Sequence, residues 1–165
     1  MQHMHAVSRD EEPEAGFTLI ELMVVVLIIA ILIAVMIPTF VGAKQRAQDR
    51  AMQSSLKNGL TAAKVVYSDH GDYTLATVAT LAAAEPGLAW VAAAALPSGQ
   101  NNVSVNPANA NYIVLGGLSK SGSCFFVSDD EAAGGLGVQY AKTAGANCSA
   151  ANAPAAGNAA WGSTW

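Results

Sequence analysis

The chain has 165 residues, of which 52% are hydrophobic and only 12% are charged, and its formal net charge is −4. This length and composition predict one small domain together with an apolar segment, and they exclude a chain that is disordered throughout. A slightly acidic chain also carries no electrostatic signature of a nucleic-acid-binding protein.

A long apolar stretch follows a short polar N-terminal segment. Residues 22–37 are sixteen consecutive apolar residues, and residues 17–37 contain a single charged side chain, Glu21. In an α-helix, these 21 residues extend over about 31 Å, which is close to the hydrocarbon thickness of a bilayer. The sequence therefore predicts a membrane-spanning helix.

Glu21 needs an explanation, because an ionised carboxylate in apolar surroundings requires a partner and residues 17–37 contain no Lys or Arg. Thr18 and Glu21 have the spacing of a capping box, and a carboxylate in the first turn suits the positive end of the helix dipole. Alternatively, cleavage of the bond between Gly16 and Phe17 would create an α-amino group four residues before Glu21. That amine would supply the missing cation.

Residues 16–26, Gly-Phe-Thr-Leu-Ile-Glu-Leu-Met-Val-Val-Val, are followed by more apolar residues and then by Pro38. This segment resembles the start of a type IV prepilin, the class III signal that type IV pilins share with the pseudopilins of type II secretion. The close similarity covers residues 16–50, about a fifth of the chain. The remainder resembles the family in its layout only.

The resemblance implies that a prepilin peptidase cleaves after Gly16 and N-methylates Phe17. It also implies that Glu21 neutralises the N-terminal amine of a neighbouring subunit during assembly. Pro38, and Gly42 nearby, would mark where the helix can bend or melt in the filament, because proline removes a backbone donor.

The predicted leader, residues 1–16, differs from many prepilin leaders, which carry Lys or Arg before the cleavage site. Here residues 10–14 contain four acids, and Arg9 is the only strong base of the leader. This acidic run resembles the leaders of Gram-positive, actinobacterial-type pilins. The positive-inside rule alone would place the N-terminus outside, because bases follow the apolar stretch, but we adopt the opposite family orientation. These bases are Lys44, Arg46 and Arg50.

Two other interpretations of this region are disfavoured. Residues 41–43, Val-Gly-Ala, form the small-residue pattern of an ordinary secretory signal cut after Ala43, but the acidic N-terminal region and the long apolar stretch oppose it. His3 and His5 are predicted to be solvated residues of a removable leader, so we place no metal there.

From residue 41 to about residue 67, apolar residues recur at steps of three and four, which predicts that the same helix continues into water with one buried face. We expect Gly59 to admit close approach of another backbone. The helix should end at His70, with Gly71 taking the left-handed cap. The expected buried residues are Met52, Leu56, Leu60, Ala63 and Val66 or Tyr67.

After the long helix, we expect a short helix at residues 75–85, which Pro86 and Gly87 would end. An extended segment is expected to begin at residue 88. Alternating or β-branched residues separated by turn residues then predict three or four antiparallel strands. Laid on the amphipathic helix, they give an α+β structure, and the resemblance implies the pilin fold. The expected strands are residues 103–105, 112–119, 124–128 and 138–142.

The predicted organisation is therefore a leader at residues 1–16, a transmembrane and assembly helix at 17–40, its amphipathic continuation at 41–70, and a globular head at 71–165. Both cysteines, Cys124 and Cys148, fall in the part that would lie outside the membrane, where pairing is the default. A disulfide there also resembles the closed C-terminal region of many type IV pilins, while two buried free thiols are the alternative.

Two features of the head have more than one interpretation. Residues 129–131, Asp-Asp-Glu, precede a Gly-rich turn; a calcium site is conceivable, but a solvated hairpin tip is the more common role, and we assign no metal. The tail beyond Cys148 is expected to be irregular. It exposes Trp161 and Trp165 unless it docks on the head or on a neighbour.

No phosphate loop, metal cluster or nucleophile signature is found, so the sequence predicts a protein that is not an enzyme and needs no cofactor. The resemblance implies a structural pilus subunit whose partners are other copies of the chain, the prepilin peptidase, the assembly platform and, before assembly, the membrane. The precursor would span the cytoplasmic membrane once, and the filament would lie on the cell surface. The alternatives are a type II secretion pseudopilin and a non-polymerising anchored or secreted binding module.

Overall fold

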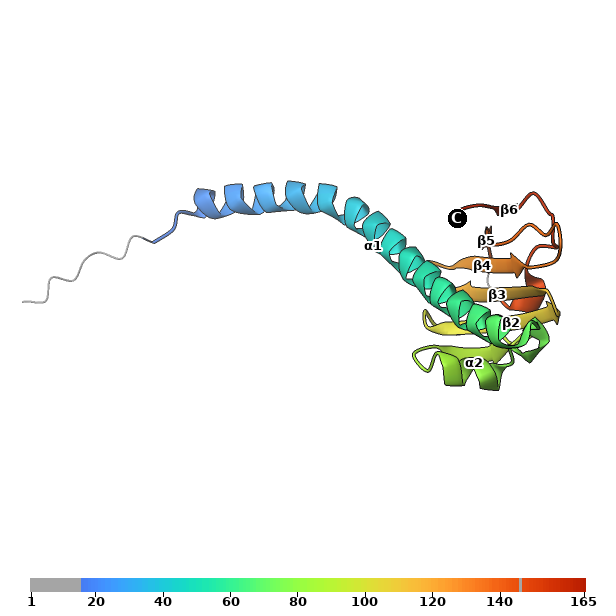
Figure 1. Ribbon diagram of the computed structural model, residues 1–165. Coiled ribbons are helices and arrows are strands. Elements are labelled where there is room, and N and C mark those ends of the chain that lie inside the picture. The colour runs from blue at the N-terminus through green and yellow to red at the C-terminus, as the bar shows by residue number, and fades with distance from the viewer. Residues whose placement is uncertain (1–15, 146) are drawn as a thin grey trace, which may run out of the picture. The chain divides into compact units, whose positions relative to one another are not determined.

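The computed structural model of the chain describes residues 16–145 and 147–165. Its elements are a long helix, a short helix and six strands, with two short 3-10 helices (Figure 1). The chain forms two compact units, the first ending at Phe40 and the second comprising Val41–Trp165, which we call the sheet unit.

Helix α1 spans Leu19–His70, a single helix of 52 residues that includes Pro38. It ends as the sequence predicts, since Gly71 has a φ of 69° and its amide donates to the carbonyl of Tyr67 at 2.6 Å. Glycine adopts this left-handed conformation without the steric cost that a side chain would add. The predicted continuation of the apolar helix into an amphipathic one is confirmed.

The six strands form one sheet in the order β1-β2-β3-β4-β5-β6. Strand β1 is parallel to β2, and all other neighbours are antiparallel. The α+β fold class is confirmed, but the expected count of three or four strands is too low, because the edge strands are short and lack alternation. The strands are β1 Ala89–Ala92, β2 Asn102–Asn109, β3 Tyr112–Leu118, β4 Ser123–Asp130, β5 Gln139–Ala144 and β6 Trp161–Gly162.

The segment between α1 and the sheet contains η1, Tyr73–Leu75, and α2, Val78–Ala84. Helix α2 is shorter than the predicted helix at residues 75–85, because Thr77 caps it and its hydroxyl accepts from the Thr80 amide at 3.3 Å. A side-chain acceptor at this position satisfies a backbone donor that would otherwise lack a partner, which fixes the start of the helix.

One face of the sheet packs against the second half of α1, as Figure 1 shows. The predicted helix residues are buried there together with Ile113 and Leu115 of β3. Gly59 faces side chains and not another backbone, since a Cβ on it would lie 3.1 Å from the Trp90 ring and 3.3 Å from Leu115. The expectation of a close backbone approach at Gly59 was therefore wrong. The buried helix residues are Met52, Leu56, Leu60, Ala63 and Val66.

The other face of the sheet has a second, smaller hydrophobic cluster, covered by the C-terminal segment. Val114 of β3 and Phe126 of β4 contribute to this cluster from the sheet, and Ala150 and Trp161 contribute from the tail. The tail forms η2, Ala150–Asn152, and then β6. It is thus more ordered than the sequence predicted, because the alternation along β3 leaves apolar residues on both faces.

The tail approaches the sheet closely at Gly116 of β3. A Cβ at Gly116 would lie 2.5 Å from the carbonyl oxygen of Cys148 and 3.1 Å from the amide nitrogen of Ala150. We therefore expect Gly116→Ala to lower the free energy of unfolding of the full chain in detergent by about 1–3 kcal/mol, because backbone atoms must move. Gly99→Ala is the control, since a Cβ there meets nothing within 4 Å. Equal stabilities of the two variants in denaturant titrations would contradict this packing.

Candidate functional site

The N-terminal motif lies at the start of the described chain. Gly16 and Phe17 precede α1, both are exposed, and Phe17 is 91% exposed. A Cβ at Gly16 would meet no atom within 4 Å. The bond between Gly16 and Phe17 is therefore unobstructed by the described part of the chain.

Glu21 forms a reciprocal capping box with Thr18. One carboxylate oxygen, Oε2, accepts hydrogen bonds from the Thr18 amide and the Thr18 hydroxyl, each at 2.8 Å. In return the Thr18 hydroxyl accepts from the Glu21 amide at 3.2 Å. The other oxygen, Oε1, accepts no hydrogen bond from the residues that the structure describes. The capping box thus uses only one of the two carboxylate oxygens of Glu21.

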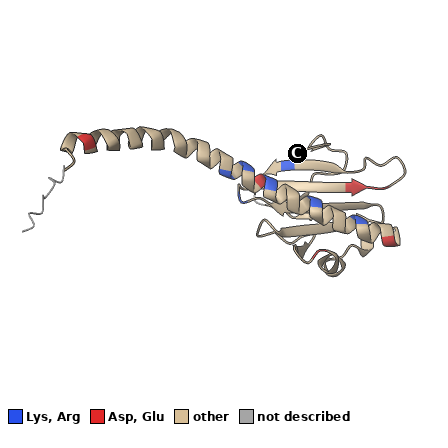
Figure 2. Ribbon diagram, turned by 60° about the vertical axis from the view of Figure 1, so that its left-hand side comes forward, with Lys and Arg blue, Asp and Glu red and all other residues tan. Residues whose placement is uncertain are grey.

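The first half of α1 exposes an apolar surface that the rest of the described chain leaves uncovered. No residue from 19 to 40 is buried, and the helix is long and apolar enough to cross a membrane. Figure 2 shows this part of the ribbon tan apart from one acidic position near its start. A contiguous apolar surface of this size requires lipid or protein around it. Among its members are Leu22, Val26, Ile29, Ile33, Ile37 and Phe40.

Asp49 fastens α1 to the sheet near the start of the sheet unit. Its carboxylate accepts hydrogen bonds from the hydroxyls of Ser119, at 2.8 Å, and Ser121, and it pairs with Lys142 at 3.1 Å. Burial alone would raise the pKa of Asp49, but the bonds from Ser121, Ser119 and Lys142 outweigh it and hold the pKa below its usual value. The carboxylate is therefore ionised in the folded protein at neutral pH.

A second fastening lies near the end of α1. Lys64 pairs with Asp129 at 2.9 Å and with Glu131 at 3.0 Å, and the Tyr73 hydroxyl donates to Asp129. Burial opposes the charge of Lys64, yet the two carboxylates keep its pKa above the usual value. Burial and the adjacent Asp129 also raise the pKa of Tyr73 far above its usual range. Asp129 is fully buried, so the expected solvated hairpin tip was wrong for this residue, which serves as an internal anchor.

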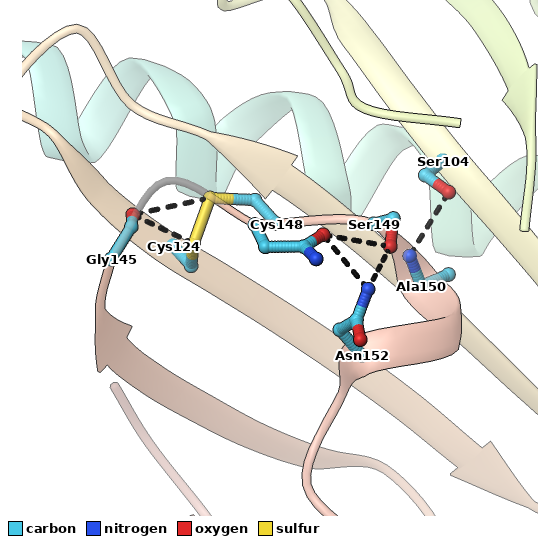
Figure 3. The surroundings of a disulfide bond; sticks show 8 residues. Ser104, Cys124, Gly145, Cys148, Ser149, Ala150 and Asn152 are labelled. Carbon is cyan, nitrogen blue, oxygen red and sulfur yellow. Dashed lines mark hydrogen bonds between the residues drawn. A yellow bond between two sulfur atoms is a disulfide. The ribbon is translucent and has the colours of Figure 1, made fainter. Parts of the chain in front are cut away.

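Cys124 of β4 and Cys148 of the tail form a disulfide. This pairing was predicted from their expected position outside the membrane. Figure 3 shows this bond beside the start of η2, where the amide of Ala150 donates to the hydroxyl of Ser104 at 3.0 Å. Both sulfur-bearing residues are buried. The bond and the adjacent hydrogen bond hold the tail on the second face of the sheet.

The two tryptophans of the tail dock on the sheet unit instead of standing exposed. Trp161 is buried, and its indole N–H donates to the carbonyl of Pro154 at 3.0 Å. The indole N–H of Trp165 donates to the carbonyls of Phe126 and Ala141, both at 3.1 Å. The sequence left open exposure, docking on the head and docking on a neighbour, and docking on the head is the outcome observed.

Within residues 16–145 and 147–165, no group of three or more His, Cys, Asp or Glu residues is placed to hold a metal ion. His3 and His5 of the leader lie outside the described residues. A function can therefore be inferred from three features: the N-terminal motif, the uncovered apolar surface, and the sheet unit with its ion pairs and disulfide.

The family model described as "Prokaryotic N-terminal methylation motif" matches residues 13–37 of the chain. The chain carries the signal of a type IV pilin-like prepilin. This prepilin signal points to a structural subunit and not to an enzyme. No curated protein and no solved structure matches the chain.

The match includes Gly16, Phe17 and Glu21 of this chain, and Pro38 directly follows it. The fastenings at Asp49 and Lys64 were not predicted from the sequence. Their partners lie 65 to 93 residues away along the chain, so no local pattern reveals them. A lone acidic residue on the buried side of an amphipathic helix, as Asp49 is, was the one available signal.

The lowered pKa of Asp49 predicts a specific pH dependence of stability. A carboxylate with a depressed pKa stabilises the fold above its unfolded pKa, and this contribution is lost as the pH falls through the folded value. We expect Asp49→Asn to cost about 1–2 kcal/mol at pH 7, and the difference from the wild type to shrink below about pH 4. Denaturant titrations of the full chain in detergent measure both. A difference that is constant with pH would contradict the ionised anchor.

The disulfide closes a loop with a sequence separation of 24. On the chain-entropy estimate it stabilises the fold by roughly 3 kcal/mol, so reduction of the wild-type chain should lower the free energy of unfolding by that amount. Cys124→Ala combined with Cys148→Ala should show no further loss on treatment with the reductant. If oxidised and reduced wild-type chains unfold at the same denaturant concentration, the tail is held by its other contacts alone.

Proposed function

We propose that the chain is a type IV pilus subunit, which after cleavage begins at Phe17 and polymerises through α1 into a cell-surface filament. One observation carries this proposal: a class III signal leads directly into a helix half that the described chain leaves uncovered. That helix continues without a break into a unit that has its own closed core.

The uncovered surface has a role in two environments. In the precursor it is solvated by lipid, which would hold the subunit as a single-pass protein of the cytoplasmic membrane. In a filament the same side chains pack against the helices of other subunits, where close packing replaces lipid contacts. The sheet unit does not need to refold during this exchange, because its core, its two fastenings and its disulfide all lie within residues 41–165.

Glu21 sets the register of assembly in this proposal. Cleavage after Gly16 frees the Phe17 amine, a cation that can pair with the Oε1 oxygen of Glu21 in a neighbouring subunit. An unpaired charge in apolar surroundings is costly, so subunits docked in the wrong register are disfavoured. The capping bonds to Oε2 are compatible with this role, since they orient the carboxylate and leave the other oxygen available.

The remaining partners follow from the same pathway. A prepilin peptidase would cut at Gly16 and methylate Phe17, and a membrane platform would add subunits to the growing filament. The disulfide fits a sheet unit on the outer, oxidising side of the membrane. Pro38 lies inside α1, where a missing backbone donor gives the helix a place to bend or melt during packing.

A pseudopilin of a type II secretion system carries the same signal and is the second candidate. The disulfide that holds the ordered tail on the sheet favours the pilin, because a long exposed filament benefits from a fastened head. A membrane-anchored module that never polymerises is the third candidate. It would use the apolar helix half for lipid alone and would give Glu21 a capping role only.

The assembly role of Glu21 separates a polymerising subunit from the membrane-anchored module. We expect Glu21→Ala to leave membrane insertion and cleavage intact but to lower the yield of sheared surface filaments by about tenfold or more. The readouts are the mass of the membrane-held subunit and the amount of filament released by shearing.

Thr18→Ala is the matched control, because it removes the hydroxyl of the capping box and retains the carboxylate. Thr18→Ala keeps the bond from the Thr18 amide to Glu21, so if capping is the whole role of Glu21, this variant should lose filament yield in the same direction as Glu21→Ala. Normal filament yield from Glu21→Ala would contradict the proposed pairing.

A further inference from the structure

The charged side chains of the sheet unit gather at two ends. At one end, Gln48 and Asp49 of α1 accept bonds from Gln100 before β2 and from Ser119 and Ser121 after β3. We call this the basic end, because five bases and one acid, Asp49, give it a formal net charge of +4. The bases are Lys44, Arg46, Arg50, Lys120 and Lys142.

The other end lies where α1 finishes and β4 ends. Lys64 is held there by Asp129 and Glu131, and the Tyr67 hydroxyl donates to Asn111 between β2 and β3. We call this the acidic end, because five acids and one base, Lys64, give it a formal net charge of −4. The acids are Asp69, Asp72, Asp129, Asp130 and Glu131.

The sheet unit is therefore neutral as a whole but polarised along α1. Only Lys57 and Glu85 are charged between the two ends. From Arg46 to Asp69 the helix rises by about 35 Å, whereas salt at physiological strength screens charges beyond about 8 Å. In Figure 2, bases mark α1 at the start of the sheet unit, and acidic positions mark the C-terminal ends of α1 and of strand β4.

Most of these charges belong to no ion pair within the described part of the chain, although Asp72 and Asp130 accept local hydrogen bonds from Thr74 and Ala132. Three ion pairs connect charged residues within the described part of the chain, and they involve two bases, Lys64 and Lys142, and three acids. The other end residues make no ion pair there and are exposed or half-buried. They are Lys44, Arg46, Arg50 and Lys120 at the basic end, and Asp69, Asp72 and Asp130 at the acidic end.

We propose that the acidic end of one sheet unit docks against the basic end of the sheet unit of another copy. The inference rests on the proposed function, and it identifies a head-to-head ionic contact in addition to the packing of the apolar helices. Complementary charge of this kind steers association and suppresses wrong registers. A contact between two different surfaces of the same chain is heterologous, and because the copies are also displaced along the helix axis, it cannot close into a ring and generates an open filament with a direction.

The two ionic contacts run in the same direction along the helix. A neighbour whose Phe17 amine reaches Glu21 is displaced toward the C-terminal end of α1 by about four residues, or about 6 Å. A copy whose basic end meets the acidic end is displaced in the same direction by about 35 Å. The head contact therefore joins copies that are several steps apart in the filament.

A second copy explains both ends, whereas an anionic lipid surface would attract only the basic end. The formal net charges of the two ends also favour a second copy, because +4 at the basic end and −4 at the acidic end cancel when the ends meet. An association with lipid would leave the acidic end without a role, and the test below separates the two.

The direct test is zero-length carbodiimide cross-linking of sheared wild-type filaments, followed by mass spectrometry. The reagent activates a carboxylate, and a Lys amine displaces the activating group to form an amide. We expect amides between Lys44 or Lys120 and Asp69, Asp72 or Asp130. The length of the sheet unit prevents such links within one copy, so each of them reports two copies in contact.

The amide between Lys64 and Glu131 is the internal control, since these groups lie 3.0 Å apart in one chain. Filaments that show the control link and no link between opposite ends would overturn the head contact and leave the proposed function standing. A chain that forms no filament at all would refute the proposed function instead.

Charge reversal provides a second test in the intact cell. Lys44→Glu, Arg46→Glu and Arg50→Glu together change the basic end from +4 to −2, and Asp69→Lys, Asp72→Lys and Asp130→Lys change the acidic end from −4 to +2. Each triple variant leaves two ends of like sign, so we expect about tenfold less filament from each. The chain with all six changes has complementary ends again and should regain most of the yield.

Arg46→Lys with Arg50→Lys is the matched control, because it keeps the charge, and it should assemble as the wild type does. Loss of membrane-held subunit from the base-reversed chain, with normal assembly of the acid-reversed chain, would assign the basic end to lipid and overturn the proposal.

Discussion

The organisation of this protein depends on one constraint: the apolar surface of the first half of α1 is not covered by the described chain. Residues 22–37 have no polar side chain, and the exposed side chains of this helix half cannot face water stably. Lipid or other helices must surround them. A segment that satisfies this requirement in two environments can be stored in a membrane and later transferred into an assembly of its own copies.

Under the proposed function, the sheet unit has the opposite requirement, because it would have to remain folded both in the membrane-held precursor and in the filament. Its core lies between α1 and the sheet, and the tail covers the other face. Asp49 fastens α1 to the sheet near the start of the unit, Lys64 does so near the other end, and the disulfide holds the tail. In the proposed assembly, the charges at the two ends that form no ion pair in these contacts would be available for other copies.

The sequence predicted the parts of this structure whose signals are local. The apolar run, the steps of three and four from Met52 to Val66, and the glycine that ends α1 each depend on neighbouring residues, and all three are confirmed. The α+β class followed from strand patterns, but the two short edge strands have too few residues to show alternation. Whether the tail is exposed or docked could not be predicted from the sequence, because the docking of Trp165 depends on the carbonyls of two distant strands.

Some residues of the candidate site could also be predicted from local sequence, whereas others required the structure. The motif around Gly16, Phe17 and Glu21 is contiguous, so its residues were predicted from the sequence, and the family match includes them. The fastening of Asp129 by Lys64 and Tyr73 joins elements far apart in the chain, and an acidic run before a glycine-rich turn gave the opposite expectation of a solvated tip. The polarity of the sheet unit could likewise be recognised only when the strands had placed each charge at one end or the other.

The most direct test of the central claim is the intact mass and N-terminal sequence of protein sheared from the cell surface. The account predicts a chain that starts at N-methylated Phe17 and is lighter by two hydrogens for the disulfide between Cys124 and Cys148. A surface protein that starts at Lys44 would contradict it by showing an ordinary secreted domain. Recovery only from membranes, with Met1 retained, would contradict it by showing a simple anchor.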